Sequence, residues 1–401
     1  MSSKEFTTLI DKVVDKITGH NTTASNTSNV PATNTTGNSN TGMLATHGST
    51  TQSTSSNTIP QIPQSFNAIV YSKGLPVHTA TVPVPQPGAD DVLIHVYNSS
   101  INPVDWKLAV YDFFNSPKPV VLGFDLAGVV AKTGANVTHV NVGDEVVAYA
   151  YLTGNGGWAD GGQGGWTIAN KDLVAKKHSQ VPFSAAGCYS IAYLTAYDGL
   201  IAYDGLKQNE SIYVVGGAGG VAHYAIQLAK TRTSKIITSG SKADSIQFGK
   251  SFGVETFNYK TDDALSVINK FTNNELLDVV YDTTYSEQSF ESNVKLIKSG
   301  GKLIIIGDLP KDDSATAQYA RSHNIQLIQS DLIRYFMAPD KYHKSVLRHA
   351  FEQAQQWYVD GTVRPHISQT INASVDSINA ALEANQKGAS PPGKVAVNLR
   401  Y

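Results

Sequence analysis

The sequence has almost no cysteine. Its 401 residues include only Cys188, so one chain can form neither an internal disulfide nor a multi-cysteine zinc site. We expect this thiol to be a small buried helix residue, because cysteine is commonly buried. The chain also lacks the roughly 18 consecutive apolar residues that a membrane-spanning helix needs. Its first residues lack the apolar segment of a secretory signal peptide.

Charge is nearly balanced overall and missing from one long stretch. The formal net charge of −2 provides no electrostatic reason to expect a nucleic-acid partner, so we expect none and predict a cytoplasmic protein. No Lys, Arg, Asp or Glu occurs from 17 to 72, and Ser, Thr and Asn dominate 21–58. Such a segment buries too little apolar surface to offset its ordering entropy. Residues 1–64 are therefore predicted to be a disordered leader.

The start of this leader has a helical pattern of apolar residues. Those that recur at helical spacing are Phe6, Leu9, Ile10, Val13 and Ile17. They predict a short amphipathic helix. One interpretation is a transient or docked helix, and the other is contact with a membrane surface or a partner. The acidic residues nearby and the absence of Arg before Arg232 disfavour a mitochondrial transit peptide.

Folded sequence begins near Phe66 with a β-rich pattern. Short runs at 68–71, 92–98 and 145–150 are separated by Pro and Gly, which predicts a barrel-like lobe. The stretch from 154 to 165 has too much glycine for regular structure and is predicted to be a mobile loop between two strands.

From about residue 188 strands and helices alternate. Four runs rich in Val and Ile, SIYVVG, KIITS, LLDVVYD and GKLIIIG, are spaced by helical segments at 219–231, 243–252, 262–271 and 286–299. This alternation predicts an α/β fold with a doubly wound parallel sheet over 188–335. A further helix at 340–359 and the terminal strand KVAVNL follow. We predict that 65–187 and 336–401 together form the strand-rich lobe.

The first strand of the second pattern ends in a glycine-rich turn. Gly217, Ala218, Gly219, Gly220, Val221 and Ala222 follow SIYVVG and open a helix. This is the G-x-G-x-x-G/A arrangement in its required context, where bare backbone amides and a helix N-terminus bind a pyrophosphate. The sequence therefore predicts a dinucleotide site.

The residues after the next strand favour NADP(H). An NAD site usually has an acid there, whereas this chain has Ser239, Gly240, Ser241 and Lys242. Hydroxyls and an ammonium group suit an additional phosphate. The nearest acid, Asp244, is better explained by the first turn of the next helix, where the helix dipole favours it.

With these motifs, the chain resembles the zinc-independent medium-chain dehydrogenase/reductase family, in its quinone oxidoreductase and enone reductase branch. The matching stretches are SINPVDWKL at 100–108, VLGFDLAGVV at 121–130, VGDEV at 142–146, LTAYDGL at 194–200, GGAGGVAHYAIQLAK at 216–230 and PGKVAVNL at 392–399. The resemblance implies a GroES-like distorted β-barrel catalytic domain, a Rossmann-type domain that binds NADPH, and commonly a homodimer.

The resemblance also places residues by position. It implies that Thr195 lies near the nicotinamide ribose, that 217–221 lie at the pyrophosphate, and that Ser241, Lys242 and Tyr259 surround the adenosine phosphate. Lys394 would lie near the active site. Gly307, at the end of GKLIIIG, is expected at the cofactor as well.

Zinc-dependent relatives have Cys where Asn102 stands and His-Glu where Phe124 and Asp125 stand, so the three-ligand zinc site is predicted to be absent. Without a metal, suitable hydride acceptors are activated substrates, namely quinones and α,β-unsaturated carbonyls. Lys107 is our first candidate to stabilise the resulting charge, with Asn102 as a supporting donor.

Several residues near these candidates have a structural interpretation too. Lys107 could face solvent, Asp105 could cap a helix, and Asp125 could be buried for structural reasons or line the site. His223 is expected to pack, and water, Tyr149 or Tyr151 could deliver the proton.

Two other functions stay open. In one, the fold is a non-enzymatic module for partner binding or membrane trafficking, and the leader carries the function. In the other, the protein is an enoyl-thioester reductase, which predicts a basic groove for the carrier that we do not identify in the sequence.

Overall fold

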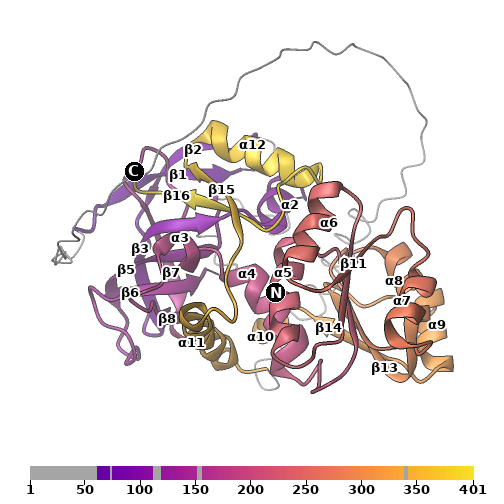
Figure 1. The fold of residues 1–401 in the computed structure, drawn as a ribbon. Helices are drawn as coiled ribbons and strands as arrows, with labels where there is room; N and C mark the ends of the chain where they lie inside the picture. The colour runs from indigo at the N-terminus through magenta and orange to yellow at the C-terminus, as the bar shows by residue number, and fades with distance from the viewer. Residues whose placement is uncertain (1–60, 73–74, 112–118, 151–155, 338–341) are drawn as a thin grey trace, which may run out of the picture. The chain divides into compact units, whose positions relative to one another are not determined.

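The computed structural model describes residues 61–72, 75–111, 119–150, 156–337 and 342–401 (Figure 1). The predicted leader, apart from 61–64, lies outside these residues, as do its amphipathic helix and Tyr151. Residues 61–64 are exposed and belong to no helix or strand. No helix within the described ranges is long and apolar enough to cross a bilayer.

A six-stranded parallel sheet confirms the predicted doubly wound fold. Its order is β11-β10-β9-β12-β13-β14, which is the strand order of the dinucleotide-binding fold. The strands are β9 Ile212–Val215, β10 Ile236–Gly240, β11 Glu255–Asn258, β12 Leu277–Asp282, β13 Ile297–Ile306 and β14 Gln326–Ser330. All residues of β9 and β10 are buried, as expected for central strands covered on both faces. The sequence pattern did not single out β11 or β14.

The connections of this sheet are helical. They are α5 Gly220–Lys230, α6 Ala243–Ser251, α7 Ala264–Thr272, α8 Glu287–Asn293, η3 Val294–Leu296 and α9 Ala315–Ser322. The first three match the predicted ranges closely. The prediction of a helix over 286–299 is wrong at its end, because β13 begins at Ile297 and pairs with Leu277 of β12. Apolar residues that suit a helix face are used there by a buried strand.

Two further sheets form the strand-rich part. One has the order β2-β1-β4, and the other has the order β15-β16-β3-β5-β6-β8, with β7 also paired to β3. Their strands are β1 Ser65–Tyr71, β2 His78–Pro83, β3 Asp91–Ser100, β4 Val120–Val121, β5 Asp125–Thr133, β6 Glu145–Tyr149, β7 Gly165–Asn170, β8 Val174–Lys176, β15 Ile367–Asn372 and β16 Lys394–Asn398. The short 3-10 helix η1 Lys171–Leu173 lies between β7 and β8. The three predicted strands in this region are confirmed as β1, β3 and β6.

The end of the chain returns to this strand-rich part. β16 pairs antiparallel with β3, and Figure 1 shows β16 and α12, in yellow, beside the indigo strands that begin the described chain. The remaining helices are α2 Pro103–Tyr111, α3 Phe183–Ala186, α4 Ser190–Tyr197, the π-helix η2 Asp198–Ala202, α10 Arg334–Met337, α11 Ser345–Asp360 and α12 Val375–Gln386. Trp106 Nε1 of α2 donates to Asn385 Oδ1 of α12 over 3.1 Å.

The glycine-rich segment is packed rather than loose over 156–164, and Gly165, the last residue of the predicted loop, is the first residue of β7. Trp158 is fully buried, and its indole N–H donates to Ser99 Oγ over 2.8 Å. Gly123, with φ +84°, leaves room for this indole, since a Cβ there would lie 2.0 Å from Trp158 Cδ1. The prediction of a loop is confirmed in that only single β-bridges form over these residues, at Ala159 and Gln163. A buried aromatic anchor was not expected.

Candidate active site

The glycine-rich turn after β9 has the geometry that the sequence predicts. Gly216 has φ +76°, a conformation that only glycine adopts without strain. A Cβ on Gly217 would lie 2.3 Å from Thr238 Oγ1 of β10, so only glycine allows this close approach to the strand. The Gly217 amide donates to the Ser239 carbonyl over 3.0 Å. The turn is thereby held against the sheet.

The helix that follows presents its N-terminus at this turn. α5 begins at Gly220, and its N-cap is Gly219, whose missing side chain makes no capping bond. The first amides of a helix have no partner within the helix, and the helix dipole is positive there. This bare N-terminus at the carboxyl edge of a parallel sheet fits the pyrophosphate of a dinucleotide.

At the end of β10, the residues predicted to hold the adenosine phosphate separate into two groups. The hydroxyl of Ser239 is buried and lies 2.7 Å from Tyr213 Oη, so this side chain supports the sheet. Ser241 is half-buried and Lys242 is exposed. Tyr259 is 54% exposed, and its amide donates to the Gly240 carbonyl over 3.2 Å. Ser241, Lys242 and Tyr259 therefore lie together beside the carboxyl end of β10.

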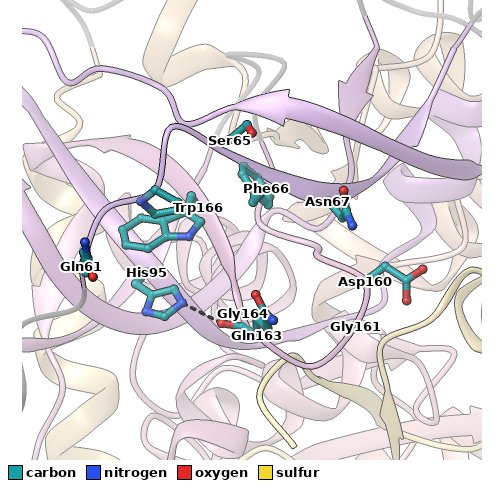
Figure 2. Close-up of a pocket in the computed structure, with 11 residues that line it drawn as sticks. Gln61, Ser65, Phe66, Asn67, His95, Asp160, Gly161, Gln163, Gly164 and Trp166 are labelled. Carbon is teal, nitrogen blue, oxygen red and sulfur yellow. Dashed lines mark hydrogen bonds between the residues drawn. The ribbon is translucent and has the colours of Figure 1, made fainter.

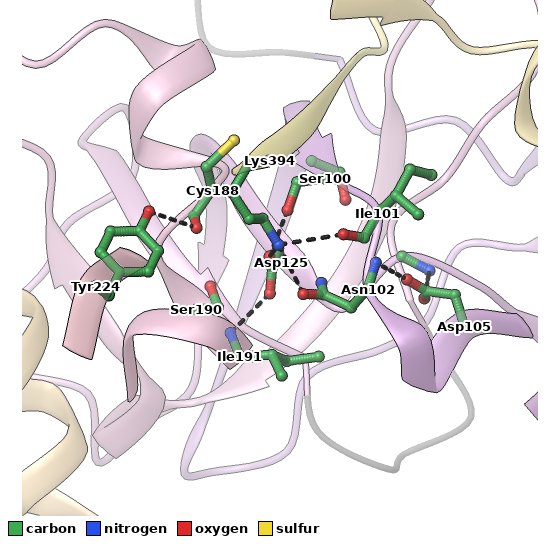
Figure 3. Close-up of polar contacts among 12 residues, drawn as sticks. Ser100, Ile101, Asn102, Asp105, Asp125, Cys188, Ser190, Ile191, Tyr224 and Lys394 are labelled. Atoms are coloured by element: carbon green, nitrogen blue, oxygen red, sulfur yellow. Dashed lines mark hydrogen bonds and ion pairs between the residues drawn. The ribbon is translucent and has the colours of Figure 1, made fainter. Parts of the chain in front are cut away.

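Close to the same turn, a buried cluster of polar side chains surrounds Lys394 (Figure 3). The Lys394 Nζ donates to Asn102 Oδ1 over 2.7 Å, to Asp125 Oδ2 over 3.2 Å and to the Ile101 carbonyl over 3.2 Å. Asp125 also accepts from Ser100 Oγ at 2.5 Å and from the Ile191 amide at 2.8 Å. The side chains of Lys394 and Asp125 are 2% and 0% exposed. Asp125 is thus buried and bonded, as one of its two interpretations expected.

This cluster is attached directly to the dinucleotide turn. Gly393, next to Lys394, donates its amide to the Ala218 carbonyl over 2.9 Å. A Cβ on Gly220 would lie 3.5 Å from Lys394 Cδ, which is ordinary van der Waals contact. The expected position of Lys394 and the expected position of 217–221 are therefore neighbouring parts of one site.

The ammonium of Lys394 also determines how the Asn102 amide is oriented. An ammonium group can only donate, so the Asn102 atom 2.7 Å away must be the amide oxygen. The amide nitrogen, Asn102 Nδ2, is buried and has no hydrogen-bond partner among the residues described. A buried amide N–H₂ without an acceptor is costly in a folded protein, so this group is a candidate donor to a ligand. Asn102 thus has a donor that no described residue accepts from.

The backbone around Asn102 is held by Asp105. The two carboxylate oxygens of Asp105 accept from the Asn102 amide at 2.8 Å and from the Gly123 amide at 3.2 Å. This confirms the capping interpretation, because the bonded amide precedes α2. Burial raises the pKa of Asp105 to about 7. Asp105 ties the start of α2 to the segment that leads into Asp125.

Lys107, on α2, lies against the aromatic ring of Tyr285, a residue that belongs to none of the sequence motifs. Its Nζ is 4.5 Å from the centre of the Tyr285 ring, and burial lowers the pKa of Lys107. The interpretation of Lys107 as a solvent-facing lysine does not fit this position. Tyr285 follows β12 by three residues, and its ring packs on Gly307, where a Cβ would lie 1.7 Å from Tyr285 Cε2. The position of Tyr285 just after a predicted parallel strand is the one signal in the sequence that could have identified it.

The structure also shows the surroundings of Thr195, His223 and Cys188, for which the sequence made predictions. The Thr195 carbonyl accepts from Tyr281 Oη at 3.1 Å and from Ser330 Oγ at 2.8 Å, so the end of α4 is anchored to the parallel sheet. His223 is fully buried in α5, and burial lowers its pKa to about 3, in agreement with the packing role expected for it. Cys188 is buried as predicted, but it lies in the turn before α4 and not in a helix.

Asn102, Phe124 and Asp125 stand at the positions where the sequence predicts that the zinc ligands of zinc-dependent relatives are replaced. Phe124 has no metal-binding atom, and Asp125 is engaged by Lys394. Throughout the described part of the chain, no three His, Cys, Asp or Glu side chains are grouped so that they could hold a metal ion.

A separate pocket of about 350 Å³ lies at the start of the described chain (Figure 2). It is lined by Phe66, Asn67, His95, Asp160, Gln163, Trp166 and neighbouring residues. His95 stacks on Trp166 with ring centres 4.3 Å apart, and its Nε2 lies 2.9 Å from the Gln163 carbonyl. None of the predicted site residues lines this pocket. The pocket does not belong to the site around Lys394.

The sequence matches two families of known proteins. Residues 88–191 match the alcohol dehydrogenase GroES-like domain, and residues 220–352 match the zinc-binding dehydrogenase family. A solved structure of the quinone oxidoreductase from Coxiella burnetii superposes with a TM-score of 0.69 at 23% identity, covering 84% of this chain and 100% of that one. At this identity the likeness shows the fold.

Curated relatives are similar over part of their length. The chain is 35% identical over 233 residues to 2-methylene-furan-3-one reductase of Solanum lycopersicum, which covers 57% of each chain. It is 32% identical over 255 residues to the chloroplastic NADPH-dependent alkenal/one oxidoreductase of Arabidopsis thaliana, which covers 61% of this chain and 63% of that one. The chain thus spans less than two thirds of these relatives.

Proposed function

The chain belongs to the medium-chain dehydrogenase/reductase family of oxidoreductases, and from this premise we propose that it is an NADPH-dependent reductase of quinones or α,β-unsaturated carbonyl compounds. The observation that carries the proposal is the Asn102 amide nitrogen, a buried donor without a partner in the described structure, next to the dinucleotide turn. The names of two relatives, an alkenal/one oxidoreductase and a furanone reductase, support the substrate class.

The proposed cofactor is NADP(H). The turn at 217–221 and the N-terminus of α5 would hold the pyrophosphate, and Ser241, Lys242 and Tyr259 would hold the adenosine phosphate. Gly240 ends β10 without a carboxylate, and Asp244 uses its carboxylate on the Ser245 amide, 2.7 Å away. Thr195, Gly307 and Lys394 complete the proposed cofactor residues, and Ser239 contributes through its backbone carbonyl.

The reaction needs a hydride and a proton. When bound, NADPH supplies the hydride, which a quinone or an electron-poor alkene carbon accepts, and NADP⁺ is left. Water supplies the proton, so that a quinone becomes a hydroquinone and an enone becomes a saturated ketone. Negative charge gathers on the substrate oxygen before this protonation, and donors aimed at that oxygen lower the barrier.

Two side chains of this protein are proposed to stabilise that oxygen. Asn102 donates from Nδ2, and Lys394 keeps the amide in the required orientation. Lys107 contributes positive charge from α2, in a partly buried position where a charge acts more strongly than in water. Cytoplasmic location and a homodimer remain predictions.

The test is turnover under anaerobic conditions. NADPH oxidation at 340 nm is measured for the full-length protein with a panel of quinones, enones and enals, and NADH is compared with NADPH. We expect turnover with at least one class and a lower KM for NADPH. If NADPH binds tightly and no compound is reduced, the proposed reaction is wrong. If NADH is preferred, the role of Lys242 is wrong.

A further inference from the structure

The side chain of Tyr285 lies at the carboxyl edge of the parallel sheet. Its backbone has φ +58°, which is rare for a bulky residue and is kept only where the surroundings enforce it. The ring rests on the Cα of Gly307 at the end of β13, in contact so close that no other residue fits at 307. The chain therefore holds a large aromatic ring at a position where a glycine or asparagine costs least.

The segment that carries Tyr285 is part of the dinucleotide edge. Thr283, two residues earlier, donates its hydroxyl to the Val215 carbonyl over 2.7 Å. A Cβ on Gly216 would lie 3.3 Å from Thr283 Oγ1, so this threonine touches the glycine-rich turn. In the doubly wound fold, a dinucleotide spans the two halves of the sheet. The adenosine half belongs to β9–β11, and the nicotinamide half belongs to β12–β14, where Tyr285 lies.

Tyr285 also meets the strand-rich part of the chain. The Nζ of Lys107 lies 4.5 Å from the centre of its ring, in cation–π geometry. Lys107 is five residues after Asn102, on the helix that starts beside the unused amide donor. The ring of Tyr285 thus stands between the sheet edge that would hold the nicotinamide and the helix that bears the proposed charge-stabilising groups.

The surroundings of the Tyr285 hydroxyl keep it protonated. Burial, followed by the nearby Asp308 and Asp331 carboxylates, raises the pKa of Tyr285. The phenol stays neutral at any physiological pH, so its contribution to a ligand is shape and a ring face. Its charge plays no part.

We propose that Tyr285 is a specificity-determining residue: its ring forms one wall of the substrate site and limits the size of the hydride acceptor to small, flat compounds. This inference rests on the proposed function. Lys107 holds the ring from one side and Gly307 supports it from the other. Removal of the ring should open the site to larger quinones, and removal of the hydroxyl alone should not.

The test compares acceptors of different size. The kcat/KM for 9,10-phenanthrenequinone, a three-ring quinone, is divided by that for 1,4-benzoquinone, a single ring. Tyr285→Gly suits the backbone conformation and deletes the ring, so we expect it to raise this ratio by at least about tenfold, the scale of a pocket-size effect. Tyr285→Phe keeps the ring and is the matched control, for which the ratio stays within about threefold. Lys107→Met removes the proposed stabilising charge and should lower both rates.

A binding measurement separates this inference from the proposed reaction. Dissociation constants of the same two quinones are measured in the presence of NADP⁺ by quenching of tryptophan fluorescence, for which Trp106, next to Lys107, is a local reporter. A shift toward the large quinone in Tyr285→Gly supports the wall even if the wild-type protein reduces neither quinone, a result that would contradict the proposed function alone. Turnover with an unchanged ratio in Tyr285→Gly overturns the inference, and so does the absence of any quinone binding. Tyr285→Asn, which also tolerates this backbone conformation, replaces the glycine variant if that variant does not fold.

Discussion

At the scale of single residues, the proposed chemistry depends on a buried amide whose oxygen is hydrogen-bonded and whose nitrogen has no partner among the described residues. Lys394 Nζ donates to Asn102 Oδ1, and the Asn102 backbone amide donates to the Asp105 carboxylate. Only the Nδ2 atom has no partner within the described residues. A side chain fixed in this way loses little entropy when it donates to a substrate oxygen, which is the condition for efficient stabilisation of a developing charge.

The first prediction concerns this donor. Asn102→Asp keeps an oxygen for Lys394 and removes the N–H₂ group. We expect kcat for enone or quinone reduction to fall by about 10²–10³, as for the loss of one oxyanion donor, while the Kd for NADPH changes by less than about threefold. Single-turnover kinetics and NADPH fluorescence titration measure the two quantities.

Ser100→Ala is the matched control for this prediction. It removes one bond to Asp125 and leaves the bond between Lys394 and Asn102, so its kcat should stay near that of the wild type. Full activity of Asn102→Asp would show that Asn102 does not donate to the substrate.

The buried imidazole of His223 makes the free energy of unfolding depend on pH. Its Nε2 accepts from the His366 amide at 3.4 Å, so its Nδ1 carries the proton and faces the Gly219 carbonyl at 3.3 Å. Burial lowers the pKa of His223 to about 3, whereas an unfolded histidine titrates near 6.5. Between these values the unfolded chain binds the proton and the folded chain does not. His223 therefore contributes stability above about pH 6.5 that is lost as the pH falls toward 3.

We predict that His223→Gln reduces this acid sensitivity. In the wild type, His223 should lower the free energy of unfolding by up to about 1.4 kcal/mol per pH unit below 6.5. Urea unfolding at pH 7.0, 5.5 and 4.5 gives this slope for both proteins. The variant should be less stable at pH 7 and lose less on acidification, and an equal slope for both would mean that another group is responsible.

At the scale of elements, the turn between β9 and α5 is the part whose geometry is most restricted. Gly217 approaches Thr238 of β10 so closely that a methyl group has no room. Thr238 is itself bonded, since its hydroxyl donates to the Val214 carbonyl over 2.7 Å. The side chain cannot move aside without loss of that bond. The strand, turn and helix behave as one unit because they meet at this contact.

A double-mutant cycle tests this contact. Gly217→Ala should lower the free energy of unfolding by about 1–3 kcal/mol, as overpacking does, and should weaken NADPH binding because the turn shifts. Thr238→Ala creates the space that the new methyl needs, so the double variant should recover most of the loss. Gly220→Ala is the control, because its Cβ meets nothing closer than 3.5 Å. Additive losses in the double variant would contradict the steric explanation.

At the scale of the whole molecule, the last strand connects the strand-rich part of the chain to the dinucleotide turn. β16 pairs with β3, and the residues at its start contact both the Ala218 carbonyl and the Asp125 carboxylate. The apolar core follows the same path, since one continuous cluster contains residues of β3, β5 and β16 together with residues of β9 and α5. Cofactor binding and the charged cluster are therefore coupled through two consecutive residues, Gly393 and Lys394.

We predict that Lys394→Met strongly destabilises the protein. It leaves the Asp125 carboxylate buried without its counter-charge, and breaking a buried pair costs about 3–5 kcal/mol. The double variant Lys394→Met with Asp125→Asn removes both charges and should be clearly more stable than the single one. Thermal unfolding by calorimetry measures both. Equal stability of the single and double variants would mean that the ion pair is not what Lys394 contributes.

The sequence by itself determined the parts that depend on local spacing. Alternating Val/Ile-rich runs and helical periods predicted the doubly wound sheet, and glycines at 217, 219 and 220 predicted the turn, because strand, turn and helix geometry is set by neighbouring residues. The end of α8 was misjudged because apolar residues near Ile297 suit a helix face and a buried strand equally.

Only the tertiary structure decided which side chains meet. Lys394 is 292 positions from Asn102 and 269 from Asp125, and Lys107 of α2 meets Tyr285, which follows β12. No local pattern records such a contact, because it depends on how the sheets pack and on side-chain rotamers chosen in that packing. The residue types therefore indicated a reductase, and the packing showed which amide it leaves unpaired.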